Sequence, residues 1–258
     1  MHQRDIQRKA EESFAAVAAF YATSAVHADA DALEELVRVA QPKLSDVVLD
    51  LATGAGHTAF AFAPHVQRVV AYDLTPAMLE QTGLGANQRG LKNIETVLGS
   101  AEQLPFEDDT FDLYTVRIAP HHFADLSLSI REAHRVLKPG GKYLVVDTSV
   151  PEDGALDAEI NEIEKIRDPS HVRNYRLSEW QQMLTAAGFH IESAEYGYIS
   201  ELDSDDWLAR MRTPEPDAEA LRQRFRDPRP ELREALKIRV HEQGIGFTLP
   251  RVTILASK

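Results

Sequence analysis

The order of apolar and polar residues predicts alternating strands and helices over the middle of the chain. Short apolar runs rich in β-branched residues predict strands at residues 47–51, 68–72, 94–98, 112–118 and 142–147. Segments with helical spacing lie between them, at residues 57–64, 76–89 and 126–137. Strands that alternate with helices form right-handed crossovers, so the pattern indicates an α/β, doubly wound, mostly parallel sheet with helices on both faces.

After the fifth strand the pattern predicts two further strands and two long insertions. Residues 189–199 and 248–256 fit a sixth and a seventh strand. Residues 151–176 are acidic and helical in part, whereas residues 203–240 predict two or three polar helices broken by prolines. The expected sheet therefore has seven strands, and both insertions are long enough to enclose a ligand.

The first 45 residues precede the first predicted strand. Residues 1–22 carry apolar side chains at helical spacing, unlike the continuous apolar block of a signal peptide. We interpret residues 1–45 as a helical segment and residues 46–258 as one domain, because ~200–250 residues suit a single α/β domain.

Charge and composition narrow the class of protein. The net charge is −13 over 258 residues, and no dense Lys/Arg patch is visible, which argues against nucleic acid and anionic membranes as partners. No stretch approaches the ~20 apolar residues that span a bilayer. The chain has no cysteine, which excludes disulfides and thiolate chemistry. We expect a cytoplasmic monomer or homodimer that acts on a small molecule.

The strongest chemical signal is a small-residue loop after the first strand. Asp50 ends that strand, and the sequence L-A-T-G-A-G-H at residues 51–57 opens a helix. Gly54 and Gly56 lack a Cβ atom, so a ligand can approach the backbone closely. In open α/β sheets, ligands bind at this end of the strands. The same loop also fits a purely structural turn.

An acidic residue, Asp73, ends the second strand and can accept two hydrogen bonds from a ribose diol. Dinucleotide-binding sites with the pattern G-x-G-x-x-G also bind a ribose through an acidic residue at this place. Ala59 stands where that pattern has its third glycine. A nicotinamide-dependent oxidoreductase is therefore an alternative, although we find no Tyr-x-x-x-Lys or similar hydride apparatus.

Four segments, in order and spacing, resemble the class I S-adenosylmethionine-dependent methyltransferases: residues 50–56, 72–79, 99–112 and 131–141. The chain is most similar to their small-molecule group around the ubiquinone/menaquinone-biosynthesis enzymes (methyltransferase domain 11). The resemblance implies a Rossmann-like fold with a helical lid, and methyl transfer from S-adenosylmethionine with S-adenosylhomocysteine as product. A non-catalytic protein that binds this cofactor is the other alternative, because a fold does not establish turnover.

The resemblance assigns the methionine and ribose parts of the cofactor to the first two strand ends. The loop after Asp50 would pass under the methionine part, through Ala52, Thr53, Gly54 and Gly56. Many relatives have glycine where this chain has Ala52. Asp73 would bind the ribose hydroxyls.

The same resemblance places the adenine beside the second and third strands. Leu74 and Met78 would flank the ring, and Ala101 and Glu102 would meet its edge. Many relatives have aspartate where this chain has Ser100. Glu102 and the Ala101 amide would therefore carry the edge contact.

Two further regions would complete the cofactor site. Arg117 and Ile118, at the end of the fourth strand, would lie near the sulfonium. Residues 14–27 resemble the segment that folds over the cofactor in this group, and Tyr21 could hydrogen-bond the cofactor carboxylate. The same stretch also fits an amphipathic helix that packs on the sheet.

Methyl transfer is an in-line displacement at a positively charged sulfur, so the protein mainly aligns and desolvates the reactants. An oxygen or nitrogen acceptor can also need a base with a pKa near the working pH, and histidine fits. We expect this role, or contact with the acceptor, for His122 or His171. Both also fit loop-anchoring hydrogen bonds.

The surroundings of these two histidines bear on the acceptor and on metal binding. His121 and His122 are adjacent, so they cannot point the same way, and no carboxylate cluster accompanies them; we expect no metal. Arg117 and Arg173 would add positive charge near the acceptor.

Overall fold

A seven-stranded sheet forms the core of the computed structural model, which describes residues 3–22, 28–242 and 244–258. The strand order is β3-β2-β1-β4-β5-β10-β6. The strands are β1 (Val47–Leu51), β2 (Arg68–Asp73), β3 (Ile94–Leu98), β4 (Phe111–Arg117), β5 (Leu137–Thr148), β6 (His190–Tyr198) and β10 (Pro250–Ser257). Strands β1 to β5 pair in parallel, whereas β10 pairs antiparallel with β5 and β6. The predicted mostly parallel, seven-stranded sheet is confirmed.

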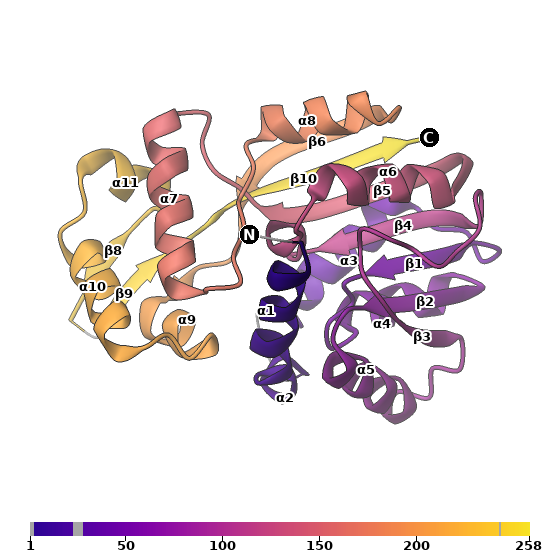
Figure 1. Cartoon of the computed structure of the whole chain (residues 1–258), viewed down its shortest axis with the longest axis horizontal. Coiled ribbons are helices and arrows are strands. Elements are labelled where there is room, and N and C mark those ends of the chain that lie inside the picture. The colour runs from indigo at the N-terminus through magenta and orange to yellow at the C-terminus, as the bar shows by residue number, and fades with distance from the viewer. Residues whose placement is uncertain (1–2, 23–27, 243) are drawn as a thin grey trace.

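Helices cover both faces of this sheet (Figure 1). They are α3 (Ala30–Ala40), α4 (His57–Phe62), α5 (Pro76–Gln88), α6 (Leu126–Val136) and α8 (Leu177–Ala186), with short 3₁₀ turns η1 (Ala63–His65) and η2 (Pro120–His122). Val48 of β1 packs with α3 and α4, whereas the next residue, Leu49, packs with α6 and α8. Since neighbouring residues of one strand are buried on opposite faces, the strand sequences are apolar without alternation.

A second lobe, on the left of Figure 1, is built by the chain between β5 and β10. It contains α7 (Gly154–Arg167), α9 (Ser204–Arg210), α10 (Glu215–Arg226), α11 (Pro230–Ala235) and a small sheet of β7 (Leu202–Asp203), β9 (Gly244–Phe247) and β8 (Arg239–His241). The lobe has its own apolar core, in which the rings of Trp207, Phe225 and Phe247 contact one another. The sequence predicts its helices but not its small sheet.

Two N-terminal helices, α1 (Gln3–Ala15) and α2 (Ala18–Ala22), lie between the lobes and pack against α5 (Figure 1). They confirm helical structure for the described part of the N-terminal segment. Residues 23–27, the end of the expected cofactor-covering stretch 14–27, lie outside the described residues. Within the described ranges, no helix combines the length and apolar character that a membrane span requires.

Candidate active site

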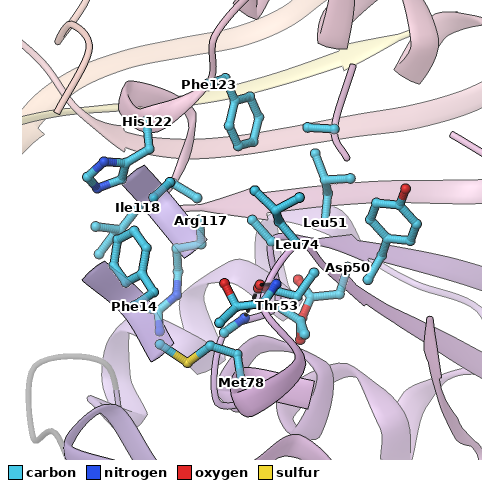
Figure 2. A pocket seen from close by; sticks show the side chains of 18 of the residues that line it. Phe14, Asp50, Leu51, Thr53, Leu74, Met78, Arg117, Ile118, His122 and Phe123 are labelled. Carbon is cyan, nitrogen blue, oxygen red and sulfur yellow. Dashed lines mark hydrogen bonds between the residues drawn. The ribbon is translucent and has the colours of Figure 1, made fainter. Parts of the chain in front are cut away.

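A cavity opens at the carboxyl ends of β1, β2 and β4, under α1 and α2 (Figure 2). Its empty space, including the open mouth and the solvent there, is about 1020 Å³. Most of the predicted site residues line it: Tyr21, Asp50, Ala52, Thr53, Gly54, Asp73, Leu74, Met78, Ala101, Glu102, Arg117, Ile118 and His122. Two predicted site residues, Gly56 and His171, are not among the described residues that line the cavity.

The loop after β1 carries residues with left-handed backbone geometry. Ala52 has φ +50° and Gly54 has φ +56°. A Cβ atom on Gly54 would meet no described atom within 4 Å, so the loop backbone is open to the cavity there. Glycine adopts this geometry without penalty, whereas an alanine pays for it. Ala52 therefore strains the loop.

Gly56 serves helix packing, and its predicted contact with the cofactor stays a prediction. It precedes α4 with φ +91°, and a Cβ atom there would lie 2.6 Å from Cζ of Phe60 and 2.9 Å from Cγ2 of Thr82. These side chains belong to α4 and α5. The two helices approach each other closely because position 56 has no side chain.

Two buried carboxylates, Asp50 and Asp73, end neighbouring strands and line the cavity. The backbone N–H groups of Gly54 and Thr75 donate to Oδ2 and Oδ1 of Asp73, both at 2.8 Å. The hydroxyl of Thr53 donates to Oδ2 of Asp50 at 2.5 Å. Burial nevertheless raises the pKa of Asp50 to about 7, and it raises the pKa of Asp73 as well. Asp73 is thus a fixed acceptor, and Asp50 titrates near neutrality.

The carboxylate of Glu102 is saturated by protein donors. Its Oε1 accepts the N–H groups of Ala124 and Asp125, at 2.8 and 3.3 Å. Its Oε2 accepts the hydroxyl of Ser100 at 2.6 Å and Nε2 of Gln7 at 3.0 Å. Sequence analysis missed Gln7, because no local pattern links α1 to a loop so far along the chain. The expected contact of the Glu102 carboxylate with adenine is not supported, since a carboxylate offers about four acceptor sites.

The end of β4 separates this cavity from a second one. Arg117 and Ile118 line both cavities, and α3, β6 and β10 supply other walls of the second. Ile118 has φ +51°, a strained geometry for a β-branched residue. Nε of Arg117 donates to Oγ1 of Thr58 at 3.2 Å, and burial lowers the pKa of Arg117 while Asp50 opposes that shift.

Tyr21 of α2 lines the cavity and joins it to the second lobe. Its hydroxyl donates to Sδ of Met211 at 3.6 Å, and its carbonyl oxygen accepts from Nε2 of His57 at 3.0 Å. Phe14 packs edge-on against its ring. Burial raises the pKa of Tyr21, so the phenol stays neutral. The hydrogen bond expected from Tyr21 to the cofactor carboxylate stays a prediction.

Phe14, Ile118 and His122 gather on one side of the cavity, opposite Asp50 and Thr53 (Figure 2). Phe14 packs edge-on against His122, with ring centroids 4.9 Å apart. This side combines apolar surface with a single imidazole. It suits an acceptor that carries one polar group.

His121 turns away from the cavity, as expected for a neighbour of His122. Its Nδ1 lies 2.6 Å from Oδ1 of Asp147, whose Oδ2 accepts the His121 N–H at 3.0 Å. Burial alone lowers the pKa of His121, but Asp147 outweighs it and the pKa is raised. Burial and the charge on His121 lower the pKa of His122 to about 3. His122 is therefore neutral and much less basic than the sequence analysis expects.

His171 and Arg173 hold a loop in place and do not line the cavity within the described structure. Nε2 of His171 lies 3.0 Å from Oδ1 of Asn161, and burial with the two other histidines strongly lowers the pKa of His171. Arg173 donates to Asp157 and Glu179, which neutralise its charge. The structure therefore brings His171 next to His122, with ring centroids 6.4 Å apart, but neither His171 nor Arg173 is among the described residues that line the cavity.

Comparisons with known proteins agree with this geometry. The model of the ubiE/COQ5 methyltransferase family matches residues 26–165. The uncharacterised methyltransferase YcgJ of Bacillus subtilis is 36% identical over 250 residues, which cover 96% of this chain and 98% of YcgJ. The crystal structure of YcgJ gives a TM-score of 0.81, covering 88% of this chain and 97% of that one. The ubiquinone/menaquinone biosynthesis C-methyltransferase UbiE of Zymomonas mobilis is 30% identical over 174 residues, 60% of this chain and 72% of UbiE.

Proposed function

We propose that this chain, which belongs to the ubiE/COQ5 methyltransferase family and is an S-adenosylmethionine-dependent methyltransferase, methylates an oxygen or nitrogen atom of a small molecule. One observation carries the proposal. The acidic end of β2, the open loop after β1 and His122 line a single cavity. The cavity therefore has room for a cofactor at one side and an acceptor at the other.

The cofactor would lie along the first three strand ends. Asp73 would bind the ribose hydroxyls, because two backbone donors orient its oxygens and leave lone pairs for a ligand. The adenine would lie between Leu74 and Met78. Asp50 and Arg117 present opposite charges to the cavity, which suits the ammonium and carboxylate of the amino-acid part.

The two N-terminal helices would form the lid over this site, with the insertions at residues 151–176 and 203–240 covering the acceptor side. Gln7, Phe14 and Tyr21 bring both helices into the cavity lining. A ligand enclosed by these helices reaches the strand ends only when they move. We therefore expect hydrogen exchange of α1 and α2 to slow when cofactor is added.

His122, whose pKa is lowered to about 3, can take the proton of an oxygen acceptor, because a hydroxyl proton becomes strongly acidic as the methyl–oxygen bond forms. A neutral amine attacks with its lone pair and needs no base in the same step. Oxygen is therefore the acceptor for which His122 has a role as base. Carbon is the second candidate, because UbiE of Zymomonas mobilis is named a C-methyltransferase.

Calorimetry with S-adenosylhomocysteine and with NAD tests the cofactor assignment. We expect S-adenosylhomocysteine to bind and NAD not to bind. Asp73→Ala should weaken binding at least ~10-fold, since it loses hydrogen bonds to a charged acceptor. Glu80→Ala, an exposed change on α5, is the matched control. Tight binding of NAD, or unchanged affinity in Asp73→Ala, would overturn the assignment.

A turnover assay identifies the acceptor. Release of S-adenosylhomocysteine is measured against panels of phenols, alcohols, amines and enolisable carbon acids, and the labelled methyl group is located in the product by NMR. A methyl ether as product would support methylation of an oxygen atom, the form of the proposal that we prefer. A new carbon–carbon bond would instead support the second candidate.

A further inference from the structure

Gln7 ties the first helix to the loop after β3 across the mouth of the cavity. Its Nε2 donates to Oγ of Ser100 at 2.9 Å and to Oε2 of Glu102 at 3.0 Å. Gln7 also lines the cavity together with Leu74 and Met78, the residues expected to flank adenine. The side chain of Gln7 is therefore placed at the end of the cavity where the base would bind.

The hydrogen bonds around Glu102 fix the orientation of the Gln7 amide. An ionised carboxylate oxygen can only accept, and the Ser100 hydroxyl donates its hydrogen to Glu102 at 2.6 Å, so Oγ of Ser100 must accept from Gln7. Both contacts require the NH₂ end of the amide. The carbonyl oxygen Oε1 of Gln7 consequently points away from Ser100 and Glu102, and the two hydrogen bonds of Nε2 hold it in that direction.

The two polar side chains that contact Gln7, Ser100 and Glu102, have no free acceptor left. Both oxygens of Glu102 accept two protein hydrogen bonds each. The Ser100 hydroxyl gives its hydrogen to Glu102 and accepts from Nε2 of Gln7 and from the N–H of Glu102. An exocyclic amino group on a bound base would therefore find its side-chain acceptor on α1.

We propose that Oε1 of Gln7 accepts the hydrogen bond of the adenine amino group, so that Gln7 determines the base specificity of the cofactor site. The inference rests on the proposed function, which places adenine between Leu74 and Met78. A base with a carbonyl oxygen at the same position would face Oε1, and two acceptors repel.

The test compares S-adenosylhomocysteine with its 6-deamino purine analogue, which carries a hydrogen in place of the adenine amino group and keeps N1 as an acceptor. Calorimetry on the full chain should show a preference of about tenfold or more for the adenine ligand. Gln7→Met keeps the length and helix propensity of the side chain and removes the acceptor, so the preference should fall below about threefold. Glu11→Gln, an exposed change on the same helix, should keep the original preference.

Two results would overturn the inference while the proposed function stands. One is wild-type protein that binds both ligands equally well. The other is a Gln7→Met variant that binds S-adenosylhomocysteine and keeps the full preference. Wild-type protein that binds neither ligand would overturn the proposed function and this inference with it.

Discussion

The two ends of the cavity are built in different ways. At the cofactor end, short loops after consecutive strands supply the polar groups, and the backbone fixes them, as Gly54 and Thr75 fix Asp73. At the end proposed for the acceptor, Phe14 and His122 meet from distant segments. Local sequence therefore sets the cofactor geometry, whereas burial and neighbouring charges set the chemistry of the acceptor side.

The largest expected effect is the loss of turnover when His122 is replaced, compared with the same replacement of its neighbour His171. His122→Phe keeps an aromatic ring against Phe14 and removes the imidazole, so kcat should fall by up to ~10²-fold, the low end of the range because the pKa of about 3 lies far below the working pH, while cofactor affinity changes less than about twofold. His171→Phe should leave kcat within about threefold and lower the melting temperature, because Asn161 loses a buried partner. Steady-state kinetics and thermal melts distinguish the two. Full turnover by His122→Phe on the identified acceptor would mean that catalysis is by positioning alone.

A pH series tests the cofactor end through Asp50. The pKa of this carboxyl is about 7 without ligand, and a cationic ligand favours its ionised form. Affinity for S-adenosylmethionine should therefore fall by up to ~10-fold per pH unit below pH 7, and Asp50→Asn should flatten this dependence. Calorimetry between pH 5.5 and pH 8 measures it. An affinity in the wild-type protein that does not change over this range would contradict the assignment of Asp50.

The Asp50 carboxyl has the opposite pH effect on the stability of the ligand-free protein: a lower pH weakens cofactor binding but stabilises the fold. Because the folded-state pKa of Asp50 lies above its unfolded value of ~3.9, the folded protein holds the extra proton between about pH 4 and pH 7. The stability contributed by that proton is lost as pH rises through this window. Thermal melts of Asp50→Asn should lack this component of the pH dependence.

The smallest expected effect concerns the strained loop. Ala52→Gly should stabilise the protein by about 0.5–1 kcal/mol, since relief of the left-handed strain exceeds the added flexibility of the unfolded chain. Ala158→Gly, at an exposed position inside α7, makes the same chemical change in helical geometry and should destabilise by about 1 kcal/mol. Urea denaturation compares them. Equal destabilisation by both changes would show that the geometry of Ala52 carries no strain.

The sequence predicts those strands, helices and loops whose residue pattern extends over one continuous stretch of the chain. The parallel strands and the loop at residues 50–56 are examples, because burial on both faces leaves a continuous apolar run. The strands β7, β8 and β9 span two to four residues each and carry too little pattern to be recognised. Gln7, and the low pKa of His122, depend on contacts between distant segments, which no window of sequence contains.

The shared wall formed by Arg117 and Ile118 has a consequence for redesign. The side chain of Ile118 borders the acceptor side and the second cavity at once, and its backbone is in a geometry that glycine prefers. Replacing Ile118 by glycine would thin this wall, leaving Arg117 in it, and relieve the strain in one step. Position 118 is therefore where a variant gains space toward α3 and the antiparallel edge of the sheet.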